Sequence, residues 1–525
     1  MLAALLSGAL PALAQSQPSA PSQPSSPQSP GQSPSQLAPQ AQQPPSGDQA
    51  AKQPETHITP QQAKELFASV GPIMQFASHD TDLAMKHMVK SKLITRAQVE
   101  KYLVAKMNDD KDAKRMERSE IVLKKFGLID SDFELKSFLV QLLDEQIAAY
   151  YDSKTKTVNM LDWIDPDTQK PVLAHELTHA LQDQHVNLDK WENMTSDDIS
   201  RNYAEDLHHV ATDEDDTARE AVVEGQAMAV FFDYSFASKH ITVRNSPEIV
   251  GQFIDTMTGS GDADDPVMAR APLLLQESLL FPYKYGLKFE ADLLKDSKEP
   301  SFAYGDVLDR PPDTSYEVMN PQAWEHHVKV PLLKMPDIHP VIDAAWSPYD
   351  IGVIGELDVQ ILAQLFGGTQ ASAELTPAWD GGIYYAAQKK DAPNKDATSS
   401  VALLYLSQWK SPDAAADFVK MYARELGHKY AFATRDSGAE TSQDEQIYKT
   451  NEGPVLIVTS GNDVFISESF DLTTARKLQL LMLGAQQASG NQVATLRRSP
   501  STDLTGDLVH FMSDCGMMKA ALPHH

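Results

Sequence analysis

Apolar residues recur every three or four positions over much of the first two thirds of the chain, which is the spacing of amphipathic helices. One such run, from Gln61 to His79, follows Thr59-Pro60. That pair is typical of a helix start, because threonine caps the helix and proline fits its first turn. The segment 132–152 is expected to be a helix that runs into a turn, and further helices are expected as far as about Lys295.

The middle of the chain combines a short strand with two helices. Thr155–Leu161 contains β-branched residues and follows a turn, so it is the best strand candidate before the first of these helices. Asp165 and Pro166 are expected to interrupt regular secondary structure, and a new helix is expected to begin at Pro171. A second, largely apolar helix is predicted over Asp215–Phe236.

After about Pro348 the pattern changes to short apolar or alternating runs, which are typical of strands. Strands are predicted at 383–388, 400–409, 445–450, 454–461 and 463–470, and helices at 355–367, 411–427 and 472–486. Adjacent strands with few helices between them favour an antiparallel sheet. The sequence therefore predicts an α+β protein: a mainly helical domain with a small sheet at 56–345, then a smaller antiparallel α+β domain at 346–490.

The two ends of the chain lack the pattern of a folded domain. The first fourteen residues are apolar and close with Ala12-Leu13-Ala14, which favours a signal peptide at 1–14 although no basic residue precedes it. Residues 15–55 are almost entirely Ser, Pro, Gln, Ala and Gly and are expected to be a disordered linker. Residues 491–525 are expected to be a poorly ordered tail. These features predict a secreted or periplasmic protein with no membrane span in its mature form.

Composition excludes some classes of partner and site. The chain has 45 basic and 73 acidic residues, a net charge of −28, whereas nucleic-acid binding needs clustered Lys and Arg. Cys515 is the only cysteine, so no disulfide can form within the chain and a cysteine-ligated zinc site is not expected.

The segment HELTH at 175–179 carries the clearest chemistry in the sequence. His175 and His179 are four positions apart on the predicted helix, hence about 40° apart around its axis and about 6 Å along it. Both rings can therefore reach one tetrahedral Zn²⁺. Glu176 lies beside the first histidine, where its carboxylate can act as general base and acid toward a metal-activated water.

The third ligand is expected on the second helix. Glu224 is preferred, because an acid on a largely apolar helix needs a partner and the following Gly225 permits close approach. Glu220 shares its helix face and is the reserve, either as a ligand or as an acceptor for a histidine N–H.

Other histidines of the sequence are candidates for the same role. His185 lies ten positions after His175, but Gln182 between them favours a continuous helix, which would carry His185 about 15 Å along the axis. His185 is therefore expected to end the helix rather than to bind the metal. His208 and His209 are expected to be solvated rather than to form a second metal site.

HELTH followed by VEGQA at 223–227 resembles the gluzincins, the thermolysin-like zinc peptidases. The wider string VLAHELTHALQDQH, with YYDSKTKTV before it and PPDTSYEVMNP after it, is similar to a family of uncharacterised exported bacterial proteins of that clan. The resemblance implies a zincin-like catalytic domain with His175, His179 and Glu224 on zinc. Two features depart from the pattern. The ligand gap of 224 − 179 = 45 residues is long, and no acid lies four residues after Glu224.

The resemblance also implies a role for a tyrosine on a later helix, which stabilises the oxyanion in related enzymes. Tyr283 and Tyr285 are the available residues, and Tyr285 is taken as the candidate. A buried structural tyrosine is the competing interpretation.

Two functions fit this set of residues. The first is zinc-dependent hydrolysis of a peptide or protein substrate, with the strand at 155–161 binding extended peptide along its edge. The alternative is a catalytically silent zincin-fold protein that serves as a binding or assembly factor of the cell envelope. Glu176 favours hydrolysis, because a binding module does not need it.

Overall fold

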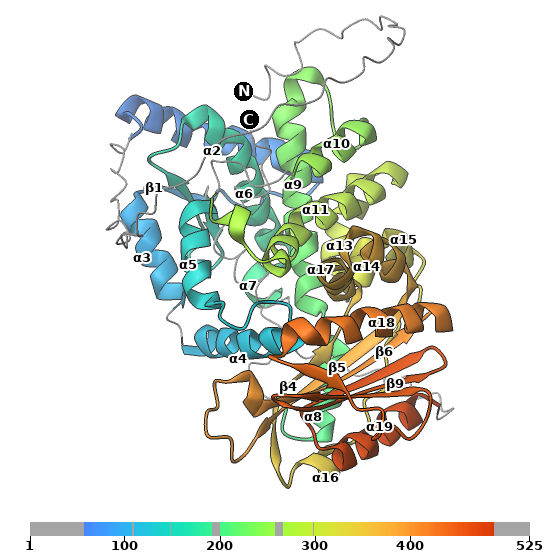
Figure 1. Cartoon of the computed structure of the whole chain (residues 1–525). Coiled ribbons are helices and arrows are strands. Elements are labelled where there is room, and N and C mark those ends of the chain that lie inside the picture. Colours follow the sequence, from blue (N-terminus) through green and yellow to red (C-terminus); the bar gives the residue numbers. More distant parts are fainter. Residues whose placement is uncertain are drawn as a thin grey trace, which may run out of the picture. The chain divides into compact units, whose positions relative to one another are not determined.

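The computed structural model describes residues 57–107, 110–146, 149–191, 200–257, 266–297 and 299–487. The expected signal peptide, linker and tail lie outside these ranges. The described part of the chain is an α+β protein, as expected: helices dominate its first part, and an antiparallel sheet of seven strands lies in its last part (Figure 1).

The first described helix, α2 (Pro60–Thr81), begins where the sequence predicts. The Thr59 hydroxyl accepts from the N–H of Gln62, and the Gln62 side chain accepts from the N–H of Thr59 at 2.9 Å. This capping box satisfies two N–H groups that the helix itself cannot pair. Helix α2 packs against α6 (Pro166–Val186), which carries HELTH.

Helix α6 begins at Pro166 rather than at Pro171, so the expectation of an irregular segment at Asp165 and Pro166 is wrong. The Asp165 carboxylate caps the helix by accepting from two N–H groups of the first turn, at 2.9 and 3.4 Å. Pro166 occupies the first helical position, where its missing N–H costs nothing. About two and a half turns of helix therefore precede His175 and support it.

A three-stranded sheet contacts α6 through two of its strands. It consists of β1 (Lys90–Ile94), β2 (Tyr150–Asp152) and β3 (Thr157–Leu161), in the order β1-β3-β2. Strand β3 is parallel to β1 and antiparallel to β2.

The three-stranded sheet corrects two expectations. Helix α5 (Leu135–Gln146) ends before residues 150–152, which form a strand instead of continuing a helix into a turn. Strand β3 confirms the predicted strand but is paired on both sides, so its own edge is not free. The free edges of this sheet, among the described residues, belong to β1 and β2.

The first part of the chain contains further helices. They are α3 (Arg96–Met107), α4 (Asp110–Phe126), α7 (Leu188–Trp191), α8 (Tyr203–Thr212), α9 (Asp215–Phe236), η1 (Ala237–Lys239), α10 (Pro247–Met257), η2 (Met268–Arg270), α11 (Leu273–Asp296), α12 (Pro300–Ala303), α13 (Gly305–Asp309), α14 (Ser315–Met319), α15 (Pro321–Glu325) and α16 (His339–Ile342). Of these, α7, α9 and α13 pack against α6. The predicted bounds of α9 are confirmed. No helix within the described ranges is both long enough and apolar enough to cross a membrane.

The last part of the chain forms the antiparallel sheet, in the order β4-β5-β6-β10-β9-β8-β7. Its strands are β4 (Trp346–Val353), β5 (Trp379–Lys389), β6 (Val401–Trp409), β7 (Ala433–Arg435), β8 (Glu445–Thr450), β9 (Gly453–Ser460) and β10 (Asp463–Glu468). Its helices are α17 (Glu356–Leu375), η3 (Thr376–Ala378), η4 (Thr398–Ser400), α18 (Pro412–Lys429) and α19 (Leu472–Gln487). Helix α18 covers one face, and α16 and α19 lie on the other (Figure 1). All five predicted strands are confirmed, whereas β4 and β7 were not predicted.

Polar contacts join the helical part of the chain to the sheet. The Asp213 carboxylate, between α8 and α9, accepts from the N–H of Val353 at 2.5 Å. The buried Lys125 ammonium of α4 lies 2.7 Å from the Glu452 carboxylate. These contacts cross the expected boundary at residues 345 and 346, so the division into two domains stays a prediction.

Three carboxyl groups lie close to Tyr304: the half-buried Asp80 at the end of α2, and the buried Asp233 on α9 and Glu290 on α11. The carboxyls of Asp80 and Asp233 hydrogen-bond to one another, and the N–H of Val243 donates to Asp233 at 2.6 Å. Burial raises the pKa of Asp80 to about 7 and that of Asp233 to about 8. It also raises the pKa of Glu290 well above its usual range.

The substitution Asp233→Asn is expected to flatten the pH dependence of stability. The pKa values of Asp80 and Asp233 are raised from 3.8 on folding, so the pair's contribution to the free energy of unfolding is complete below about pH 4 and is lost as the pH rises to about 8. The loss approaches about 1.4 kcal/mol per pH unit for each proton released. Asparagine keeps an acceptor for the Val243 N–H and removes one titration. Urea unfolding of both proteins from pH 5 to 8 measures the two slopes, and equal slopes would contradict the assignment.

Candidate metal centre

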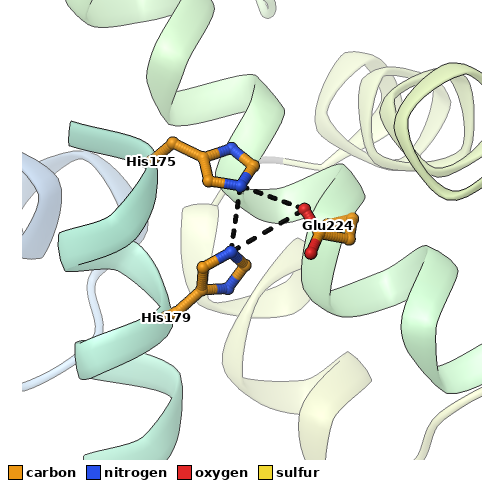
Figure 2. A group of neighbouring side chains, drawn as sticks. All are labelled: His175, His179 and Glu224. Carbon is orange, nitrogen blue, oxygen red and sulfur yellow. Dashed lines mark hydrogen bonds and ion pairs between the residues drawn. The ribbon is translucent and has the colours of Figure 1, made fainter. Parts of the chain in front are cut away.

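Three of the predicted site residues meet between helices α6 and α9. His175 and His179 lie one turn apart on α6, and Glu224 faces both of them from α9 (Figure 2). The two Nε2 atoms are 2.9 Å apart, and Glu224 Oε2 lies 3.0 Å from Nε2 of His175 and 3.7 Å from Nε2 of His179. All three side chains are buried. No other group of three or more His, Cys, Asp or Glu side chains in the described ranges is arranged to hold a metal ion.

This spacing fits a tetrahedral ion. Zinc binds histidine nitrogen and carboxylate oxygen at about 2.0–2.2 Å, which places ligand atoms about 3.3 Å apart at a tetrahedral angle. The three separations of 2.9, 3.0 and 3.7 Å lie around that value. Two imidazoles and one carboxylate are also a donor set that zinc accepts, and three protein ligands leave one position open for chemistry.

Burial keeps both histidines neutral. It lowers the pKa of His175 to about 3 and that of His179 to about 4, and the Glu224 carboxylate partly offsets the effect at His179. A neutral imidazole offers a nitrogen lone pair, whereas a protonated ring cannot bind a metal. Near neutral pH both rings are therefore in the form that a metal requires.

Glu176 occupies the same buried region as the two histidines. Burial first, and then the charge of Glu224, raise the pKa of the Glu176 carboxyl to about 8, while the N–H of Tyr151 opposes this shift. A carboxyl group tuned to this range can both accept and release a proton near neutral pH. This property suits the role that the sequence predicts for Glu176.

Tyr151 of β2 connects the strand to α6 at two points. Its N–H donates to Glu176 Oε2 at 2.7 Å, and its hydroxyl donates to Asp183 Oδ2 at 2.7 Å. Asp183 in turn pairs with the Lys156 ammonium at 2.7 Å. Because residues seven positions apart share one face of a helix, these contacts hold β2 alongside the stretch of α6 that carries HELTH.

Two glycines set the approach of α9 to α11. A Cβ on Gly225 would meet the backbone carbonyl carbon of Gly286 at 2.2 Å, and a Cβ on Gly286 would meet the carbonyl oxygen of Ala221 at 2.1 Å. The two helices therefore cross with their backbones in contact. The sequence interpretation expects Gly225, next to Glu224, to permit the close approach of another helix or of the metal. The structure shows that it permits the close approach of helix α11.

The structure does not bring the other candidate ligands to this group. His185 lies in the last turn of α6, where its Nε2 is 3.1 Å from Asp309 Oδ1, so the helix continues through Gln182 as expected. Glu220 is buried on α9. His208 and His209 lie on α8, where His208 is half-buried and His209 is buried, so the expectation that both are solvated is wrong for His209.

The assignment of Tyr285 to the site is corrected. Its hydroxyl donates to the Gln360 side chain of α17 at 2.9 Å, whereas the ring of Tyr283 lies 6.3 Å from the His175 ring, centroid to centroid. Two residues apart on a helix point to nearly opposite sides, so both tyrosines cannot face the site. Tyr283 is the one beside the histidines, and Tyr285 is a structural contact between α11 and α17.

Two residues of the site were missed by sequence analysis. The sequence predicts a helix and turn at Tyr151, and no local pattern indicates its contact with Glu176. The sequence indicates Gln182 only as a helix former, yet its Oε1 lies 2.9 Å from Nδ1 of His179. The spacing of three residues between them was a usable signal, because residues three apart are neighbours on a helix surface.

Comparisons with known proteins give no further guide: no family model, no curated protein and no solved structure matches this chain.

Proposed function

We propose that this protein is a zinc-dependent peptidase of the gluzincin type, with a zincin-like catalytic part. The observation that carries the proposal is the buried group of His175, His179 and Glu224, with the carboxyl group of Glu176 close enough for the Glu224 charge to act on it. A metal site that serves only structure does not need a buried, tunable carboxyl group beside it.

The roles of the side chains follow from their chemistry. His175, His179 and Glu224 would hold the zinc, which when bound supplies Lewis acidity toward the scissile carbonyl and the attacking water. Glu176 takes a proton from that water and passes it to the leaving amine. The N–H of Tyr151 donates to the Glu176 carboxylate and so orients it for this transfer.

Strand β2, rather than β3, is the proposed binding edge for an extended substrate. Tyr151 lies opposite Val158 in the antiparallel pair, yet its N–H is directed to Glu176. In such a pair a residue whose N–H does not bond to its partner strand turns both its N–H and its C=O outward. The outer side of β2 therefore faces the candidate site. The Tyr151 N–H is already used by Glu176, so a peptide strand added there would pair with the outward Tyr151 carbonyl oxygen and pass Glu176.

The proposed function also covers where the protein acts and which class of substrate it cleaves. The pattern at residues 1–14 is the ground for proposing export to the periplasm or the exterior, where peptides or proteins would be the substrates.

Metal analysis combined with peptide cleavage tests this function. The purified full chain should contain one zinc per molecule and should cleave members of a peptide library. Chelation should remove cleavage, and added zinc should restore it. A zinc-free protein that does not take up zinc would refute the proposal. Stoichiometric zinc without any cleavage would favour the alternative, a binding or assembly factor of the cell envelope.

A further inference from the structure

Gln182 links one of the candidate ligands to the neighbouring helix. Its side chain is completely buried, with Oε1 at 2.9 Å from Nδ1 of His179. Its Nε2 donates to the carbonyl oxygen of Val223 at 3.0 Å and to Oε1 of Gln226 at 2.9 Å. All the amide atoms of Gln182 are thus engaged, either with α9 or with His179.

The far end of this chain of hydrogen bonds is anchored on the main chain. Gln226 Nε2 donates to the carbonyl oxygens of Ala303 and Tyr304, at 3.0 and 3.1 Å. A carbonyl oxygen can only accept, so the amide nitrogen of Gln226 must face these two atoms. The Oε1 atom of Gln226 then faces Gln182. Because this oxygen only accepts, Gln182 must offer it an N–H.

The same reasoning fixes the other side chains in turn. Gln182 must point its amide nitrogen to Gln226 and Val223, which leaves its oxygen for His179. Because that oxygen only accepts, Nδ1 of His179 must carry the proton. Nε2 of His179 is then unprotonated and lies toward His175 and Glu224. Three backbone carbonyls on two segments, Val223 of α9 and the adjacent Ala303 and Tyr304, thereby determine the tautomer of a ring in the candidate site.

We propose that Gln182 is the positioning residue that fixes His179 in the Nδ1–H tautomer and so prepares its Nε2 to bind zinc, with Gln226 holding Gln182 in the required orientation. The inference rests on the proposed function for its metal, but the tautomer exists in the metal-free protein. Gln182 would also provide the hydrogen bond to a ligand histidine that no acid four residues after Glu224 can provide in this chain. Such a bond to the distal nitrogen of a metal-binding histidine orients the ring and raises its basicity.

Two measurements test the role of Gln182. The ¹⁵N shifts of His179 in the metal-free full chain distinguish an Nδ1–H from an Nε2–H ring, and His179→Asn assigns the signal. Competition with a chelator gives the zinc affinity. The nearly isosteric Gln182→Met removes the acceptor, so the ring should lose its Nδ1–H signature and zinc affinity should fall about 10–100-fold. Gln226→Met should act in the same direction and by less.

Two control variants separate positioning from folding. Gln182→Glu keeps an oxygen toward Nδ1 but loses the N–H donors to Val223 and Gln226, so a melting curve must first show that it folds. The folded variant should keep the Nδ1–H tautomer, which a merely structural role would not predict. Gln184→Met lies on the same helix, but Gln184 bonds to the backbone of Lys86 and His87. It should leave both readouts unchanged.

The outcomes distinguish this inference from the proposed function. If Gln182→Met keeps the Nδ1–H tautomer and the wild-type zinc affinity, the inference is overturned while the peptidase proposal stands. If the wild-type chain binds no zinc, the peptidase proposal fails, and the ¹⁵N measurement still decides whether Gln182 fixes the ring. A Gln182→Glu variant that folds with the wild-type melting temperature and still loses the Nδ1–H tautomer would also overturn the role of the acceptor oxygen.

Discussion

Glu176→Gln is expected to lower hydrolysis by about 10²–10⁴-fold and to leave zinc bound, because it removes the proton carrier and none of the three candidate ligands. The glutamine retains a carbonyl oxygen for the N–H of Tyr151, which now donates to Glu176 Oε2 at 2.7 Å. The local fold should therefore survive. The measurements are kcat/KM on a cleaved peptide and zinc content by elemental analysis.

The informative control for this variant is Tyr151→Phe. It removes the hydroxyl that donates to Asp183 but keeps the backbone N–H that donates to Glu176. Its effect on hydrolysis should be far smaller than that of Glu176→Gln. Loss of zinc from Glu176→Gln would mean that Glu176 is a ligand and that the assigned roles are wrong.

Glu224→Ala is expected to weaken zinc binding more than any other single substitution on α9. It leaves two imidazoles, whereas catalytic zinc keeps three protein ligands. The loss should exceed the about 10–100-fold that follows from removing a hydrogen-bond partner of a ligand. Glu220→Ala should fall below it. Titration with a competing chelator measures the affinities, and melting curves with chelator present show whether each variant folds.

His185→Ala is the matched test of the competing ligand. The pair of His185 and Asp309 is partly exposed, so its loss should cost at most about 1 kcal/mol and should leave the metal in place. Should His185→Ala empty the site while Glu224→Ala stays loaded, the gluzincin assignment fails and the protein is metzincin-like. Glu224→Gln, which keeps the volume of the side chain, distinguishes a lost ligand from a disturbed core.

The parts of this structure that local sequence could predict are those whose causes are local. Helix α9 was predicted with its observed bounds because it is apolar over six turns. The pairing of His175 with His179 needs only the pitch of a helix. Glu224 could be chosen because an acid buried on such a helix requires a partner.

The parts that could not be predicted depend on distant residues or on an ambiguous signal. Asp165-Pro166 is compatible both with a chain break and with a helix start, and only the cap geometry decides between them. Strand β1 is short and polar, and its pairing with β3 joins segments more than sixty residues apart in sequence. Gln182 acquires its role through Val223 and Gln226, which no pattern around HELTH reveals.

The crossing of α9 and α11 constrains how this protein can change over evolutionary time. A side chain at Gly225 or at Gly286 would meet main-chain atoms of the opposite helix, so no substitution at one position can compensate for a substitution at the other. Both glycines should therefore be retained wherever the three ligands are retained. A search for remote relatives should weight Gly286 with HELTH and Glu224, and a mutagenesis library aimed at new specificity should keep both glycines fixed.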